Sequence, residues 1–281
     1  MNNANVTGQG TSPGPDAPSE VLPGGLGSGG PVLRRGVAVR RPAPANAPAL
    51  HEFLRALRAS GFAGAPLPRR LSEEGWEELE FIQGEVPVSP YPWWSMSDGA
   101  LASVGRLLRR YHESAAEVGV DRSAPWPAAL ADPEGGPIVC HDDVCFPNVV
   151  FRDRHAAALI DFDFAAPGRP VWDLAMAARY WAPLRDPDSA AVSGLDHLDP
   201  FRRLRVFVDA YGLDGAARRE LVDVLEPATD VCRAFVTERV TAGDAGFVSA
   251  LETHGGWERW DRLQAWMVAN RARFADALSA P

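Results

Sequence analysis

Ile138-Val-Cys-His-Asp-Asp-Val-Cys-Phe-Pro-Asn148 and, after a polar turn, Ala158-Leu-Ile-Asp-Phe-Asp163 are the stretches of sequence that decide the fold. Each begins with a short apolar run that is typical of a buried strand and ends in polar side chains. The first run leads into a loop with the pattern H-x-D-x-x-x-x-N, from His141 to Asn148. The second run ends at Asp161, so acidic and amide side chains follow two neighbouring strands.

This order of side chains suits phosphoryl transfer, in which an enzyme orients the attacking group and neutralises phosphate charge with a metal ion. Asp143 is the candidate that accepts a hydrogen bond from the attacking hydroxyl. Asn148, Asp161 and Asp163 offer hard oxygen atoms of the kind that Mg²⁺ accepts while it retains water. The order of a base followed by two metal ligands is that of kinases. We therefore expect a magnesium-dependent reaction with a nucleoside triphosphate.

The segment between the two motifs has the pattern of a β-hairpin. Residues 149–151 and 157–160 are apolar, and the polar turn 152–155 joins them. Such a hairpin would bring Asn148 and Asp161 together at its open end.

The segment from His141 to Ala175, including Asp161-Phe-Asp163 and Val171-Trp-Asp-Leu-Ala175, resembles the aminoglycoside phosphotransferase and choline kinase-like family. Looser similarity extends upstream to about Val21. The resemblance implies a bilobal protein-kinase-like fold of the α+β class, with a small β-rich N-terminal lobe and a larger, mainly helical C-terminal lobe. It also implies ATP or GTP as donor, Mg²⁺ as cofactor and a small-molecule acceptor.

Carried over by position, the resemblance makes Asp143 the catalytic residue and Asp173 a buried acid that braces the catalytic loop. His141 belongs to the same loop, where it either supports the backbone or contacts a ligand directly. Asp142 and Asp163 are each expected to be a solvated or hydrogen-bonded neighbour, and Asp163 could instead assist a second magnesium ion.

The sequence divides into three parts. Residues 1–19 are rich in Gly, Pro, Asn and Ser without periodic apolar residues, so we expect a disordered tail. Residues 20–83 would form the nucleotide-binding lobe, and residues 84–281 the catalytic and acceptor-binding lobe.

A glycine-rich stretch, 24–30, separates the apolar pairs Val21-Leu22 and Val32-Leu33, which indicates a hairpin. Its backbone amides are either a cover for phosphates or a flexible turn. The candidate nucleotide contacts in this loop are Gly25, Gly27, Ser28 and Gly29.

The next strand, 36–42, matches the kinase strand that carries a phosphate-binding lysine. By alternation, Ala38 and Arg40 share one face, and Val39 and Arg41 share the other. We take Arg40 as the phosphate-binding cation and Ala38 as its neighbour at the nucleotide. The chain contains no lysine, and its 28 basic residues are all arginine. Arginine binds phosphate as a planar fork, so the exchange is not conservative.

Two further segments complete the expected nucleotide site. Residues 48–58 have helical periodicity, and Glu52 either pairs with the strand cation or lies exposed. Residues 77–84 indicate the last strand of the small lobe, leading into a hinge. Glu80 and Ile82 are candidates for contact with the nucleotide base by position.

The rest of the chain is expected to be helical, with helices at 98–118 (capped by Ser97), 199–211, 214–241 and 256–278. These helices would form the acceptor pocket. Eight of the nine tryptophans lie here, either as packing or as an aromatic wall for a cationic amine. Asp230 and Glu238 are acids that could face the same cavity.

Composition narrows the class of protein. A net charge of −9 argues against nucleic-acid binding and is compatible with a cationic acceptor. Three cysteines are too few and scattered for a disulfide framework, and neither a leader nor a membrane-length apolar run is evident. We therefore expect a cytoplasmic protein without a membrane partner.

The leading hypothesis is a small-molecule kinase that transfers the γ-phosphate to a hydroxyl of an aminoglycoside-type antibiotic, an amino alcohol or a related metabolite. One alternative is a non-catalytic, nucleotide-binding pseudokinase, supported by Arg40 and the unusual glycine loop. Another takes His141-Asp142 as the metal pair of a phosphohydrolase.

Overall fold

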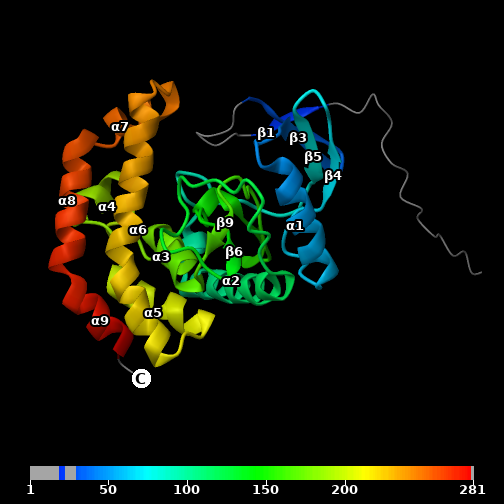
Figure 1. Ribbon diagram of the computed structural model, residues 1–281. Helices are drawn as coiled ribbons and strands as arrows, with labels where there is room; N and C mark the ends of the chain where they lie inside the picture. The colour runs from blue at the N-terminus through cyan, green and yellow to red at the C-terminus, as the bar shows by residue number, and fades with distance from the viewer. Residues whose placement is uncertain (1–18, 23–29, 280–281) are drawn as a thin grey trace, which may run out of the picture.

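A computed structural model describes residues 19–22 and 30–279, which form a small lobe around a sheet and a larger helical lobe (Figure 1). The order of elements confirms the expected α+β architecture, with the strand-rich lobe first and the helical lobe second. The glycine-rich candidates Gly25, Gly27, Ser28 and Gly29 lie outside the described residues.

The small lobe contains a five-stranded antiparallel sheet in the order β1-β2-β3-β5-β4. The expected pairing of Val21-Leu22 with Val32-Leu33 is confirmed, because Val21 lies opposite Leu33 and Leu22 opposite Val32. The elements of this lobe are β1 Glu20–Leu22, β2 Val32–Arg35, β3 Ala38–Pro42, α1 Ala47–Ala59, β4 Pro68–Leu71 and β5 Trp76–Glu80.

In the large lobe, short strands and the first long helix, residues 98–118, lie beside the small lobe, and the later helices lie farther away (Figure 1). Its first half contains the 3₁₀ turn η1 Trp93–Met96, α2 Asp98–Val118, β6 Ile138–Cys140, η2 Phe146–Asn148, β7 Val149–Arg152, β8 His155–Leu159 and β9 Ala166–Gly168. Its second half contains α3 Pro170–Trp181, α4 Pro187–Val192, α5 Pro200–Tyr211, α6 Gly215–Thr241, α7 Ala245–Thr253, α8 Gly256–Ala269 and α9 Arg271–Ser279.

Three helices begin where capping side chains predict them. Ser97 accepts a hydrogen bond from the Ala100 amide at the start of α2. Asp199 and Asp214 do the same for the first amides of α5 and α6. Each cap satisfies an amide that would lack a partner within the helix.

The prediction of a single helix at 256–278 is wrong, because α8 ends at Ala269 and α9 begins at Arg271. The buried Asn270 side chain donates to the Trp266 carbonyl at 2.8 Å, which competes with backbone bonding at this point. Helix α7 was not predicted.

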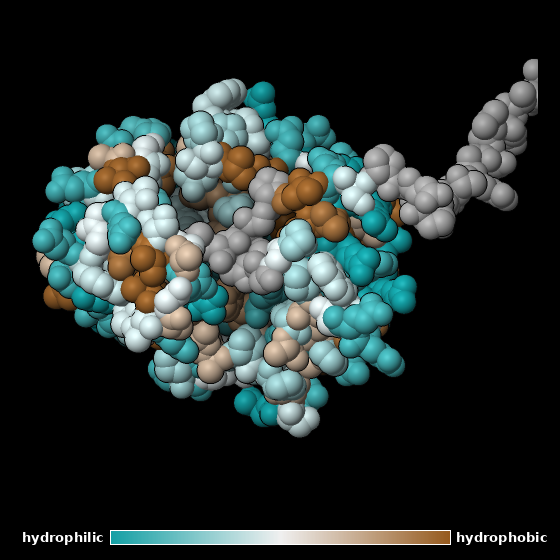
Figure 2. All heavy atoms as spheres, turned by 90° about the horizontal axis from the view of Figure 1, so that it is seen from above, coloured by the Kyte–Doolittle hydropathy of each residue, from teal (hydrophilic) through white to brown (hydrophobic). Residues whose placement is uncertain are grey.

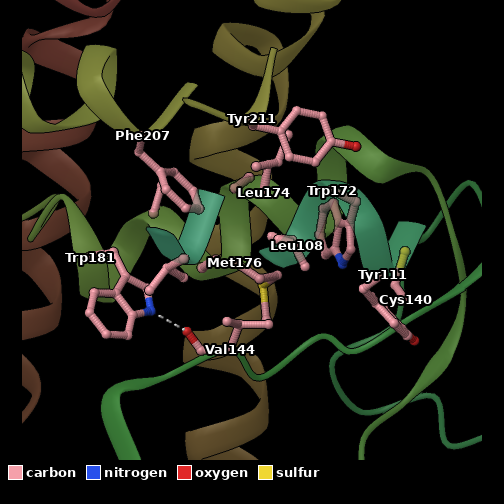
Figure 3. Close-up of a cluster of buried hydrophobic side chains, with 14 of the residues drawn as sticks. Leu108, Tyr111, Cys140, Val144, Trp172, Leu174, Met176, Trp181, Phe207 and Tyr211 are labelled. Carbon is pink, nitrogen blue, oxygen red and sulfur yellow. Dashed lines mark hydrogen bonds between the residues drawn. The ribbon is translucent and has the colours of Figure 1, made fainter. Parts of the chain in front are cut away.

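The core of the large lobe is built around α3, which is buried on nearly all sides (Figure 3). The Trp181 indole donates to the Val144 carbonyl at 2.8 Å, as the dashed line in Figure 3 shows, and the Trp172 indole donates to the Leu130 carbonyl at 3.0 Å. Because Val144 lies in the H-x-D-x-x-x-x-N loop, the core holds this loop directly.

Seen from above in Figure 2, the molecule is hollowed on this face, with brown apolar residues around the hollow. Within the described part of the chain, no helix has both the length and the apolar character needed to cross a membrane.

Candidate active site

Asp173, on α3, holds the start of the catalytic loop. Its two carboxylate oxygens accept hydrogen bonds from the backbone amides of His141 and Asp142, both at 2.9 Å. The His112 ring contacts the same carboxylate at 2.9 Å. Burial alone would raise the pKa of Asp173, but these hydrogen bonds and the charges of His112 and His141 outweigh it and lower that pKa. Asp173 therefore occupies the bracing position that the resemblance implied.

The His141 side chain is fully engaged with the backbone. Its Nε2 lies 3.0 Å from the Ile160 carbonyl, and its Nδ1 accepts from the Asp143 amide at 3.3 Å. Its ring packs on Phe162 with the centroids 4.4 Å apart. Of the two roles left open for His141, this geometry corresponds to the supporting one and places no ring nitrogen toward a ligand.

Asp142 is buried and has a left-handed backbone, with φ of 62°. Neither of its carboxylate oxygens has a hydrogen-bond partner among the residues that the structure describes. Burial, followed by the charges of Asp173 and Asp132, raises its pKa well above the usual range. The expectation of a solvated or hydrogen-bonded neighbour is therefore wrong for Asp142.

Asp143 lies at the wall of the main cavity and is oriented by Asn148. The Asn148 amide nitrogen donates to the Asp143 carbonyl at 2.9 Å and to its Oδ2 at 3.0 Å. The Tyr180 hydroxyl lies 3.5 Å from the other carboxylate oxygen. Burial, with a smaller effect from the charge of Asp161, raises the pKa of Asp143. The result is a fixed carboxylate at a cavity wall, the arrangement that a hydroxyl-activating group needs.

Asp161 and Asp163 converge on one cation, Arg41 of β3. Arg41 Nη1 lies 2.6 Å from Asp161 Oδ1 and 3.2 Å from Asp163 Oδ2, and Nη2 contacts Asp163 Oδ1. Burial is the main cause that raises the pKa of Asp163 to about 6, with Asp161 adding to the effect and Arg41 opposing it.

The hairpin predicted between the motifs is confirmed, and the Ile160 amide donates to the Asn148 carbonyl at 2.9 Å at its open end. Since the Asn148 amide nitrogen is bound to Asp143, its side-chain oxygen is the atom left for a metal ion. Two carboxylates that already attract a cation, together with this oxygen, are a donor set that fits Mg²⁺ with retained water.

Arg41, not Arg40, faces the acids of the large lobe. Arg41 lies directly opposite Glu77 in the sheet, and its Nε donates to Glu77 Oε1 at 2.7 Å. The His51 ring of α1 lies 2.7 Å from the other Glu77 oxygen. Arg40 instead lies over the Trp76 ring, 4.9 Å from its centroid. The two faces of β3 were separated correctly by alternation, but the wrong face was assigned to the site.

Other small-lobe candidates lie away from this cluster. Glu52 is exposed, while its neighbour His51 turns to Glu77. Glu80 pairs with Arg58 at 2.7 Å, so its side chain is engaged in a contact between β5 and α1.

Ala38 lies opposite Glu80 in the sheet, and Ile82 is half-buried just beyond β5. Neither residue contributes to the wall of the main cavity.

Glu77 and His51 were missed by sequence reasoning, together with the role of Arg41. A signal was present, because the period of a strand places Glu77 on the same face as the buried Leu79. A buried glutamate requires a cation or other hydrogen-bond partner, which would have directed attention to the inward arginine.

The main cavity has a volume of about 870 Å³ and extends from the acids to the late helices. Trp260 is the one tryptophan that lines it within the described structure, so the tryptophans do not form an aromatic wall there. Asp230 and Glu238 do not line it either, because Asp230 accepts from Gln264 and Glu238 is exposed. The expectation that these two acids face the cavity is wrong.

The fold and the arrangement of Asp143, Asn148 and Asp161 define a protein of the protein-kinase-like phosphotransferase class. A family model described as the phosphotransferase enzyme family matches residues 119–207. The chain is 31% identical over 259 residues to a trifolitoxin immunity protein of Rhizobium leguminosarum bv. trifolii, which covers 88% of this chain and 95% of that protein. The chain belongs to this phosphotransferase family, that of aminoglycoside phosphotransferases and choline kinase-like proteins.

A partial match joins the chain to a homoserine kinase of Methylobacterium nodulans, 34% identical over 151 residues, or 52% of this chain and 39% of that enzyme. Among solved structures, a choline/ethanolamine kinase family protein from Mesorhizobium loti has a TM-score of 0.61 at 18% identity and covers 94% of this chain and 93% of its own. An aminoglycoside phosphotransferase from Streptomyces rimosus, in complex with ADP and streptomycin, has a TM-score of 0.51 at 18% identity, with 76% and 94% covered. These two structures establish the shared fold.

Proposed function

We propose that the protein is a magnesium-dependent kinase that transfers the γ-phosphate of ATP or GTP to a hydroxyl group of a small molecule. The observation that carries the proposal is the position of Asp143, held by Asn148 at the wall of a cavity into which Asp161 and Asp163 also open. Membership in a phosphotransferase family and a fold shared with an ADP complex support the nucleotide as donor.

In the transfer, the acceptor oxygen forms a bond to the γ-phosphorus, and the bond from that phosphorus to the oxygen bridging to the β-phosphate breaks. The hydroxyl proton passes to the Asp143 carboxylate and then to solvent, and the nucleoside diphosphate leaves. Asn148 fixes one oxygen of Asp143 and leaves the other toward the cavity and Tyr180. Asp143 would thus orient the hydroxyl before the transfer.

Asn148, Asp161 and Asp163 are the side chains that would hold magnesium, which when bound neutralises charge on the phosphates. Arg41 lies against both acids and is the small-lobe cation placed to meet the phosphates beside them. Glu77, fully buried, accepts from Arg41 and keeps its guanidinium in position.

The test is a donor-consumption assay against antibiotics, amino alcohols and hydroxy amino acids, run with wild type and Asp143→Asn. We expect nucleoside diphosphate to form with at least one acceptor and the variant to turn over about 10² to 10⁴ times more slowly, the range for loss of a general base. A melting temperature close to wild type would show that the variant is folded. Near-normal turnover by a folded Asp143→Asn protein would remove Asp143 from the proposed role.

A pseudokinase is the second candidate, and the observation that favours it is Arg41 itself. This residue already pairs with both Asp161 and Asp163, the acids that a metal ion would need. Calorimetry separates the two functions: binding of nucleotide without formation of diphosphate, with any acceptor of the panel, would favour the pseudokinase.

A further inference from the structure

The part of the cavity wall that comes from α3, the segment after it and α8 is rich in arginine. Arg179 lies on α3, Arg185 follows it in the chain, and Arg259 lies on α8. None of these three arginines forms an ion pair with any residue in the described ranges. Most other guanidinium groups near acids are paired, as Arg41, Arg169 and Arg218 are.

Contacts within the protein hold these arginines without neutralising them. Arg185 Nη2 donates to the Arg179 carbonyl at 3.0 Å, and its Nη1 donates to the Ser193 hydroxyl at 3.1 Å. Arg179 Nη1 contacts the Cys232 sulfur. Arg259 Nε is buried without a hydrogen-bond partner in the described structure. The guanidinium groups are therefore positioned but keep their charge.

Burial opposes the charge of Arg179, but Cys232, Tyr180 and Asp143 outweigh it and raise the pKa of that residue. Arg185 and Arg259 have no acid partner in the cavity wall, and such a pair is unfavourable unless a ligand supplies negative charge. Guanidinium remains protonated in proteins, so neighbouring arginines repel one another. Burial, followed by the charges of Arg259 and Arg179, lowers the pKa of Arg185 to about 10. Burial also lowers the pKa of Arg259, an effect that Asp186 opposes and Arg179 reinforces.

Among the described residues, the acids that line the cavity are Asp143, Asp161 and Asp163. Asp161 and Asp163 are bound by Arg41, and Asp143 accepts from Asn148. Asp186, close to Arg185 in sequence, lies 3.7 Å from Arg262 and is not part of the cavity wall. The charges that act most strongly on Arg185 are those of Arg259 and Arg179. The cavity wall thus combines three acids with two arginines, Arg185 and Arg259, that have no acid partner in that wall.

We infer that the phosphate acceptor is an anionic alcohol, whose carboxylate or phosphate group binds Arg185 and Arg259 while its hydroxyl lies at Asp143. This inference rests on the proposed kinase function and names its acceptor class. Arginine forks match both carboxylate and phosphate oxygens in bidentate geometry. The same two arginines would repel a polycationic amino sugar, although the net charge of the chain is compatible with a cationic acceptor.

The test uses acceptors in matched pairs: a set of hydroxy acids, each with its carboxamide, together with phosphate-bearing alcohols and cationic amino sugars. The carboxylate and phosphate arms show which anion the site takes. We expect turnover of the anionic members and none above background for the amides and amino sugars. Arg259→Gln should raise KM for the anionic acceptor by about 10- to 100-fold, as for loss of a charge-assisted hydrogen bond. KM for the nucleotide should stay within about twofold of wild type.

The matched control is Arg262→Gln, because Arg262 is an exposed arginine on the same helix that does not line the cavity. This variant should leave both KM values unchanged. Arg259→Lys, which keeps the positive charge, should recover part of the lost affinity and guards against a trivial folding defect in Arg259→Gln.

Anion binding is also measured without turnover, by titrating nucleotide-free protein with inorganic sulfate at constant ionic strength and following the fluorescence of Trp260 and its neighbours. Equal turnover of acids and amides, or unchanged acceptor KM in Arg259→Gln, overturns the anionic acceptor and leaves the kinase standing. A second outcome is that no acceptor is turned over, while sulfate binds to wild type and Arg262→Gln but not to Arg259→Gln. This result would retain the anion site and overturn the kinase function. Absence of both turnover and sulfate binding overturns both.

Discussion

At the scale of single residues, Arg41 and Arg40 are neighbours with opposite surroundings, and their variants should behave differently. Arg41→Gln removes the cation from fully buried Glu77, so we expect a loss of about 3 kcal/mol in unfolding free energy. Donor consumption should fall as well. Arg40→Gln loses only the contact with Trp76 and should change stability by about 1 kcal/mol or less. Urea denaturation and ADP formation measure both effects, and equal losses in the two variants would contradict this assignment.

Asp142 is a buried acid whose replacement should stabilise the protein. Its folded-state pKa is raised, mainly by burial, so the native protein holds a proton that the unfolded chain releases above its ordinary pKa. Stability is therefore full at low pH and falls as pH rises toward the raised pKa, by up to about 1.4 kcal/mol per pH unit. Asn cannot ionise and also tolerates the left-handed backbone at this position.

We therefore expect Asp142→Asn to melt at a higher temperature than wild type at pH 7 and the difference to shrink as pH falls toward about 4. Because both proteins share every other titrating group, the difference between them isolates Asp142. A difference that grows on acidification would contradict a raised pKa.

Several site positions were predictable because the chemistry depends on spacing along one loop and one hairpin. One loop and one hairpin bring Asp143, Asn148 and Asp161 together. Residue spacing within such short segments can be recognised in the sequence. The inward arginine was not predictable in this way, because alternation defines two faces of β3 without saying which one faces the site. That depends on the register with β5, which places Glu77 opposite Arg41.

At the scale of elements, the crossing of α2 and α5 depends on Gly105. A Cβ at this position would lie 2.7 Å from the Phe207 carbonyl oxygen and 3.2 Å from the Tyr211 amide, and backbone atoms cannot move aside as a flexible side chain can. We expect Gly105→Ala to cost about 1 to 3 kcal/mol, as overpacking does. The control is Gly99→Ala in the same helix, where the nearest atom is the Ser97 hydroxyl at 4.0 Å.

Gly99→Ala should be neutral or stabilising by up to about 1 kcal/mol, because alanine has the higher helix propensity. Thermal or denaturant unfolding of the two variants under the same conditions measures the contrast. A stable Gly105→Ala protein would mean that α2 and α5 can separate without penalty.

The ends of helices that have polar capping residues were predicted within a residue or two. Helices whose limits depend on packing in the core were not predicted. Helix α2 begins after Ser97 and ends at Val118 as expected, because caps act through adjacent backbone groups. Helix α3 was not predicted as an element, since burial on nearly all sides leaves it no polar stripe and hence no clear period. The break at Asn270 depends on the buried hydrogen bond from its side chain to the Trp266 carbonyl, which no sequence pattern indicates.

At the scale of the whole molecule, the two lobes meet at an ion pair that also belongs to the site. Arg41 comes from the small lobe, and Asp161 and Asp163 come from the large lobe. Any cation that binds these acids therefore acts on the contact between the lobes. Nucleotide and metal should accordingly stabilise the molecule together rather than independently.

We expect magnesium with ATP to raise the melting temperature, because a ligand that binds the folded state at about 100 times its Kd adds about 2.7 kcal/mol. For a chain of this size the shift would be about 5 to 10 °C, and ATP with EDTA should produce a much smaller one. Asp161→Asn should lose the magnesium-dependent part. Asp153→Asn, an exposed and left-handed position in the turn of the same hairpin, should keep it. Differential scanning calorimetry of the three proteins decides the matter: a full magnesium-dependent shift in Asp161→Asn would place the metal ion elsewhere.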